Sequence, residues 1–187
     1  GHDSALEVCA LSFDGKLLAT ASKKGTLLRI WDTATNEKIQ EVRRGADQVN
    51  IQSLCFSPKT AKWLAVSSDK GTVHIFKVKK TSTSEEKSPK AHTSNTIPDK
   101  DEKEVENPTS NLTMFKSVLP KYFSSEWSFA QFRTANVKTL VAFGSADNVL
   151  IVVSADGMFY KASFDEEKGG ECKLLEKVEF LKKKNSE

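Results

Sequence analysis

Short runs in which apolar and β-branched residues alternate with polar ones recur along the chain, and turn-forming pairs separate them. In the first unit these pairs are Asp14-Gly15, Lys24-Gly25 and Thr35-Asn36. Alternation with a period of two predicts β-strands, and Gly or Asn between the runs predicts hairpin turns. We therefore expect four short strands at 8–11, 17–22, 27–32 and 38–42.

The first unit carries the marks of a WD repeat. It opens with Gly1-His2, and its third strand closes with Trp31-Asp32, which predicts one four-stranded propeller blade. The pattern begins again near residue 51, and Gly71-Thr72 repeats Gly25-Thr26 at an interval of 46 residues. A third unit follows, with strands expected at 140–143, 149–154, 159–164 and 173–178. The predicted fold is all-β, with about three four-stranded blades of a WD-repeat β-propeller.

Residues 79–111 interrupt the second unit and differ in composition from the rest. They are almost wholly Lys, Glu, Asp, Ser, Thr, Asn and Pro, without Phe, Tyr or Trp. Such a segment cannot bury enough apolar surface to offset its ordering entropy, so we expect a disordered loop insertion. Residues 126–132 then supply the delayed fourth strand of that blade.

The expected blades span residues 1–46, then 47–78 with 112–133, then 134–181, and residues 182–187 form a tail. Closed propellers typically have four to eight blades. We therefore expect the chain to be the C-terminal part of a longer propeller.

Charge and composition exclude several classes of function. The formal net charge is +3, from 28 basic and 25 acidic residues, which is too small for a general nucleic-acid binder. The three cysteines are odd in number and are expected to be reduced thiols rather than disulfides or metal ligands. None of the three histidines belongs to a recognisable catalytic arrangement, so we expect no enzyme, no metal and no cofactor.

Arg43 and Arg44 are the strongest candidates for ligand binding. Because successive strand side chains point to opposite faces, two adjacent guanidinium groups can serve two separate anion sites. Each flanking repeat adds hydroxyls, a Lys-Gly-Thr turn and another polar side chain: Ser22, Lys24, Thr26 and Arg29 in one, and Ser68, Lys70, Thr72 and His74 in the other. Such donors suit a phosphorylated head group. We expect two similar pockets with both arginines on the rim; solvated basic residues beside capped hairpins are the alternative.

The residues that carry this pattern resemble the PROPPIN family of seven-bladed β-propellers, which bind polyphosphoinositides and act in autophagy. The resemblance lies in residues 19–26, Arg43-Arg44-Gly45 and residues 67–76, and residues 119–127 look most like plant members. Val42 stands where the family's motif often begins with Phe or Leu. The resemblance implies that the units are blades five, six and seven, and that the missing N-terminal blades are a partner of this chain.

The resemblance also implies how the sites are composed. A first lipid site would hold Arg43, His2, Ser22, Thr26 and Arg29, and a second would hold Arg44, Ser68, Thr72 and His74. The implied ligands are phosphatidylinositol 3-phosphate and the 3,5-bisphosphate. The implied location is cytoplasmic and peripheral on preautophagosomal, endosomal or vacuolar membranes, where the protein would recruit autophagy proteins. A WD-repeat interaction scaffold without lipid binding is the alternative from another class.

An apolar stripe follows the insertion and ends near Ser124. Its members recur at helical period, which predicts a segment that inserts into a membrane interface: Leu112, Phe115, Val118, Leu119 and Phe123. Pro120 breaks an uninterrupted helix, so a strand or turn packed on the second blade is the alternative. In the resembled family the corresponding loop inserts into the bilayer.

Overall fold

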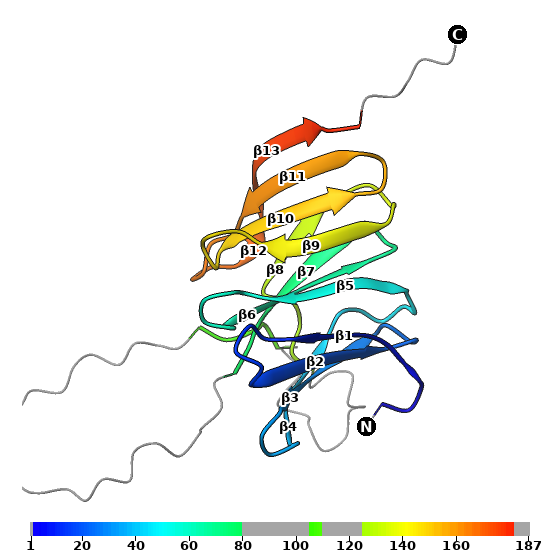
Figure 1. The fold of residues 1–187 in the computed structure, drawn as a ribbon, viewed down its shortest axis with the longest axis vertical. Coiled ribbons are helices and arrows are strands. Elements are labelled where there is room, and N and C mark those ends of the chain that lie inside the picture. The colour runs from blue at the N-terminus through cyan, green and yellow to red at the C-terminus, as the bar shows by residue number, and fades with distance from the viewer. Residues whose placement is uncertain (1, 80–104, 110–124, 182–187) are drawn as a thin grey trace, which may run out of the picture.

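The computed structural model describes residues 2–79, 105–109 and 125–181, which form three β-sheets stacked in sequence order (Figure 1). The first sheet consists of β1 (Leu6–Leu11), β2 (Leu17–Ser22), β3 (Leu27–Asp32) and β4 (Lys38–Arg43). The second contains β5 (Ile51–Phe56), β6 (Trp63–Ser68), β7 (Thr72–Lys77), β8 (Ala130–Arg133) and β12 (Gly170–Glu171). The third contains β9 (Thr139–Phe143), β10 (Val149–Ser154), β11 (Met158–Ser163) and β13 (Lys173–Glu179).

Within each sheet the long strands are antiparallel neighbours, and short turns join the first three strands of each sheet, whereas the insertion separates β7 from β8. Gly25 and Gly71 occupy equivalent turns, between the second and third strands, with φ of 63° and 66°. A Cβ on Gly25 would lie 2.1 Å from the carbonyl oxygen of Val49, so this turn needs glycine for space as well as for its backbone angle.

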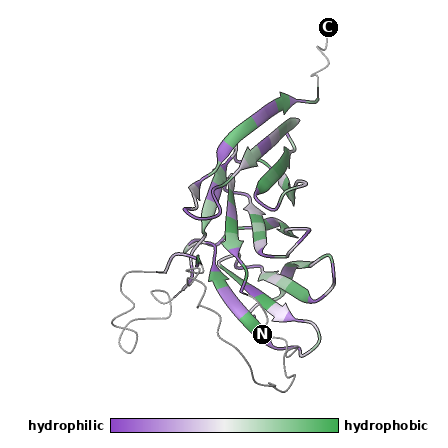
Figure 2. Ribbon diagram, turned by 90° about the vertical axis from the view of Figure 1, so that its left-hand side faces the viewer, coloured by the Kyte–Doolittle hydropathy of each residue, from purple (hydrophilic) through white to green (hydrophobic). Residues whose placement is uncertain are grey.

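Apolar side chains fill the two interfaces between neighbouring sheets, which we call the first and second seams. Figure 2 shows the hydrophobic segments of the strands. The first seam joins Leu28, Ile30 and Val42 of the first sheet to Leu64 and Phe76 of the second. In the second seam, the Trp63 ring lies 4.9 Å, centroid to centroid, from both Phe129 and Phe164. Each sheet therefore buries the apolar half of its alternating pattern against its neighbour.

The predicted all-β architecture of propeller blades is confirmed, with two local differences. The fourth strand of the second sheet begins at Ala130, four residues later than expected. The two-residue strand β12 was not expected, because Gly170-Glu171 has no hydrophobic pattern. It leaves the third unit and pairs in parallel with β8 of the second sheet.

Several sequence predictions fall outside the described residues: most of the insertion, namely 80–104 and 110–111, the apolar segment 112–123, and the tail 182–187. Within the expected insertion, Lys79 and residues 105–109 are described and contact the second sheet: Lys77 and Asn107 bond each other, and Trp127 donates its backbone N–H to the Pro108 carbonyl at 2.8 Å. The expected disorder therefore does not extend over residues 105–109. Among the described residues, no helix is long and apolar enough to cross a membrane.

Candidate anion-binding site

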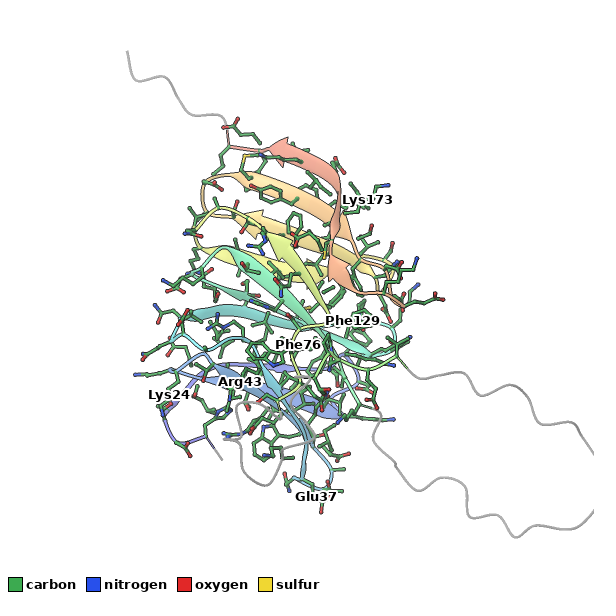
Figure 3. All side chains as sticks on the ribbon, turned by 180° about the vertical axis from the view of Figure 1, so that it is seen from behind. Lys24, Glu37, Arg43, Phe76, Phe129 and Lys173 are labelled. Carbon is green, nitrogen blue, oxygen red and sulfur yellow. The ribbon has the colours of Figure 1, made fainter. Side chains whose placement is uncertain are left out.

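Arg43 and Arg44 leave the first sheet in different directions. Val42 points into the first seam, where it is fully buried. Alternation therefore sends Arg43, the last residue of β4, to the open face of the first sheet and turns Arg44 back toward the seam. Figure 3 shows Arg43 at the same end of this sheet as Lys24, which lies in the β2–β3 turn. The predicted separation of the two guanidinium groups is present in the structure.

Arg44 is buried, with only 8% of its surface exposed, contrary to the expectation that it lies on the rim. Its Nε donates to the Gly25 carbonyl at 3.0 Å, and Nη2 donates to the Asp47 carbonyl. Burial lowers the pKa of Arg44, and the charges of Asp47 and Asp69 oppose that shift. Arg44 therefore braces the turn regions that flank the first seam, and this role could not be read from an Arg-Arg pair.

The second predicted set gathers around this seam. Ser68, at the end of β6, and His74, on β7, are 1% and 9% exposed, while Thr72 is half-buried. The side chains of Thr72 and His74 alternate with Val73, which faces the other seam, so both face the first sheet. The structure thus brings Arg44, Ser68, Thr72 and His74 to one seam.

The surroundings of His74 in this seam lower its pKa. Burial lowers its pKa to about 4, and the positive charges of Arg44 and Arg133 add to the shift. Its Nδ1 shares a hydrogen bond of 3.2 Å with the Ser128 hydroxyl. At neutral pH the imidazole is therefore uncharged, beside two cations whose field favours an anion.

Arg43, Arg29 and His2 of the first predicted set lie on the open face of the first sheet, where Arg29 is already paired with a carboxylate. Arg29 Nε donates to the Glu41 carboxylate at 2.7 Å, and Lys38 approaches the same oxygen at 3.3 Å. Burial raises the pKa of Glu41, but the bond to Arg29 and its charge outweigh burial and hold it below the usual value. An anion at this face would compete with Glu41 for Arg29.

His2 has a partner inside the blade. Its Nε2 bonds the Thr20 hydroxyl at 2.9 Å, and the Trp31 indole N–H donates to the same oxygen at 2.9 Å. The Gly-His and Trp-Asp dipeptides that predicted the blade are thus joined through Thr20. His2 lies on the same face as Arg29. Burial lowers the pKa of His2, and the positive charge of Arg29 lowers it further.

The two repeats differ by one residue in the turn that follows Ser22 and Ser68. Strand β3 begins at Leu27, whereas β7 begins at Thr72, so aligning the glycines places Thr26 just before its strand. Thr20 pairs with Arg29, and Val66 pairs with His74, which makes Arg29 and His74 equivalent. Leu27, not Thr26, therefore occupies the position of Thr72, and Thr26 offers its backbone carbonyl to the Arg44 N–H at 2.9 Å.

A polar clasp ties the first sheet to the second beside Arg43. We use this name for five residues: Gln40, Lys77, Lys79, Asn107 and Glu126. The Glu126 carboxylate accepts from Gln40 at 2.7 Å, Asn107 at 3.1 Å and Lys79 at 2.5 Å. The Glu126 carbonyl also accepts the Arg43 backbone N–H at 2.8 Å.

The clasp determines where Arg43 lies. Arg43 Nε donates to the hydroxyl of Ser125, the residue before Glu126, at 3.0 Å. The chain that holds the end of β4 is therefore the same chain that leads from the insertion into β8. Sequence patterns could not reveal this arrangement, because 86 residues separate Gln40 from Glu126.

Replacing Glu126 with Ala should lower the free energy of unfolding by about 1–3 kcal/mol, because the amides of Gln40 and Asn107, each about 95% buried, would each lose one of two acceptors and keep only the Lys77 carbonyl. Urea denaturation measures the change. Lys79→Ala is the matched control: it removes only a partly exposed ion pair, worth less than about 1 kcal/mol. Equal losses in the two variants would contradict the central role of Glu126.

No cluster of metal-ligating side chains occurs in the part of the chain that the structure describes. Cys9, Cys55 and Cys172 are all free. Burial, followed by the charge of Glu171, raises the pKa of Cys172 to about 12, so its thiol is protonated at neutral pH and weakly nucleophilic.

Three stacked sheets of four or five strands, together with the bonds that join His2 and Trp31 through Thr20, are typical of the blades of a WD-repeat β-propeller. Comparison with known proteins gives the family: the PROPPIN family model matches residues 1–181, and the chain belongs to that family. PROPPIN proteins are non-enzymatic phosphoinositide-binding propellers, in agreement with the prediction that the chain is not an enzyme.

Individual relatives agree with this assignment. The chain is 37% identical to autophagy-related protein 18e of Arabidopsis thaliana over 96% of its own length and 42% of that protein. It is 36% identical to WD repeat domain phosphoinositide-interacting protein 2 of Xenopus laevis, covering 93% of this chain and 39% of that one. The structure of Kluyveromyces lactis Hsv2 with a complete loop 6CD matches with a TM-score of 0.65 and 25% identity, over 96% of this chain and 50% of Hsv2. The chain thus spans about half the length of these relatives.

Proposed function

We propose that this chain is the phosphoinositide-binding part of a peripheral membrane protein of autophagy. The single observation that carries the proposal is the division of Arg43 and Arg44 between two faces at the end of one strand. The face of Arg43 also carries Ser22 and Arg29, and Ser68 and His74 face the seam that holds Arg44. Phosphate is the ligand chemistry that planar guanidinium groups and hydroxyl donors suit best. The Xenopus relative is named as a phosphoinositide-interacting protein, which supports the same chemistry.

In this proposal, phosphatidylinositol 3-phosphate and the 3,5-bisphosphate bind at two sites. The first comprises Arg43, His2, Ser22, Thr26 and Arg29, and the second comprises Arg44, Ser68, Thr72 and His74. The proposal includes peripheral attachment to preautophagosomal, endosomal or vacuolar membranes and recruitment of autophagy proteins, and membership of the family supports both. Because the chain spans about half the length of its relatives, the proposal also includes further blades of the same propeller that complete the ring.

Flotation with liposomes tests the proposal against the scaffold alternative. The chain should float with vesicles that contain phosphatidylinositol 3-phosphate and remain at the bottom with vesicles of equal charge made with phosphatidylserine. A chain that ignores the 3-phosphate but retains an acidic protein partner would favour the scaffold function.

The apolar segment 112–123 lies outside the described residues, and its membrane role remains part of the proposal. Changing Phe115, Leu119 and Phe123 together to Ser should weaken flotation with these liposomes, since burial of apolar side chains in the interface drives insertion. Binding of soluble inositol 1,3-bisphosphate should stay unchanged in a calorimetric titration. Unaltered flotation, or a parallel loss of head-group binding, would place these side chains in the protein core.

A further inference from the structure

The internal repeat of the sheets identifies a cation that the sequence motif does not contain. Arg43 ends β4 and pairs with Leu27, the first residue of β3. In the second sheet the residue that ends β8 and pairs with Thr72, the first residue of β7, is Arg133. Arg133 is therefore the structural counterpart of Arg43, although a long insertion separates it from Thr72 in sequence.

The other members of the two sets obey the same correspondence. Ser22 and Ser68 each end the second strand of their sheet. Arg29 and His74 have equivalent partners on that strand, Thr20 and Val66. The first sheet thus presents Ser22, Arg29 and Arg43, and the second presents Ser68, His74 and Arg133 at matching positions.

The third sheet shows that this pattern is not general to the blades. Its fourth strand pairs Glu179 with Met158, the first residue of β11, so the position of the arginine holds an acid. Tyr160 stands where the other sheets have Arg29 and His74. Among the described residues, only the first two sheets carry an arginine at the end of the fourth strand.

Arg133 is more accessible than Arg44. Its side chain is 71% exposed, whereas Arg44 is 8% exposed and donates to two backbone carbonyls. Cross-strand partners share a face, so Arg133 lies on the same face of the second sheet as Thr72, and its charge contributes to the lowered pKa of His74. Its carboxylate partner is Glu171 of β12, at 3.7 Å, also largely exposed.

We propose that Arg133 supplies the accessible guanidinium of the second anion site, where a phosphomonoester displaces the carboxylate of Glu171, and that Arg44 forms the buried base of that site. This inference rests on the proposed function and adds a residue to it. A phosphorylated inositol ring and free inorganic phosphate share the required chemistry. The second site would then hold two guanidinium groups around one ligand, as suits a head group with two phosphates.

Isothermal titration of the 187-residue chain with soluble inositol 1,3,5-trisphosphate tests the inference, in a background where Arg43→Gln removes the first site. Adding Arg133→Gln should weaken the remaining binding about tenfold or more, because a charge-assisted hydrogen bond is lost. Glu171→Gln should strengthen binding about two- to fivefold by removing the competing carboxylate. Lys161→Gln, a cation on the third sheet, should change nothing.

The outcomes separate the two levels of the proposal. Unchanged affinity in Arg133→Gln, with a melting temperature equal to its background, overturns the role of Arg133 and leaves phosphoinositide binding intact. No heat of binding from the unmodified chain contradicts both. Inorganic phosphate titrated alone distinguishes the ligand's source: equal affinity for phosphate and the inositol phosphate would indicate a simple phosphate site.

Discussion

The chain with Arg43→Thr and Arg44→Thr should fail to float with liposomes that contain phosphatidylinositol 3-phosphate. Each substitution removes a guanidinium from a different site, and a charge-assisted hydrogen bond contributes about 1.5–3 kcal/mol, so the combined affinity should fall at least a hundredfold. Vesicle flotation at fixed ionic strength measures the loss. Lys16→Thr, which removes an exposed cation from the turn between β1 and β2, is the matched control.

The two single variants should differ in stability. Arg44→Thr leaves the carbonyls of Gly25 and Asp47 without their donor, which should cost about 1–3 kcal/mol. Arg43→Thr should cost less, because its side chain is only partly buried. The binding result is therefore interpretable only at a temperature where the double variant is folded by circular dichroism. A folded double variant with unimpaired flotation would contradict both lipid sites.

Acidification from pH 6.5 to 4.5 should destabilise the protein mainly through His74. In the unfolded chain this histidine takes up a proton near pH 6.5, whereas the folded chain resists protonation until about pH 4. The unfolded state binds more protons in this window, so the free energy of unfolding falls as pH falls. The full effect approaches about 3 kcal/mol at pH 4, from about 1.4 kcal/mol per pH unit.

Urea denaturation at half-unit steps of pH measures this dependence, and His74→Gln supplies the comparison. The variant should show a shallower slope between pH 6.5 and 4.5, with the remaining part due to His2, whose pKa is also lowered by burial. Glu41 adds acid sensitivity only below its ordinary pKa, because its folded-state value is depressed. Parallel slopes in the two proteins would show that His74 takes up its proton at the same pH in the folded and unfolded states.

The strand pattern of the sequence was sufficient for the blades but not for the details of the sites. Alternation and the two WD dipeptides identified every long strand, because one buried face imposes a period of two. The extra residue before Leu27 was hidden, since Gly25 and Gly71 align without showing where each strand begins. That difference separates Thr26 from Thr72, which the sequence equated.

The alternating pattern also could not predict contacts between segments that are distant in sequence. The Glu126 clasp and the position of Arg133 depend on strand β8 returning beside β7 after the insertion. The signal that could have revealed Arg133 was its place at the end of a fourth strand, as Arg43 ends the first unit's fourth strand. The burial of Arg44 depends on the seam between sheets, which a single strand does not show.

Because β12 pairs in parallel with β8, the second and third sheets are connected differently from the first and second. Gly170 and Glu171 connect the third unit to the second sheet through backbone hydrogen bonds. The clasp connects the first sheet to the second largely through side chains. When force is applied between the chain ends, the first sheet should therefore separate first, while the second and third sheets stay together. The first sheet would separate along the seam that holds Arg44, so pulling would expose the buried Arg44 and His74 before the other two sheets come apart.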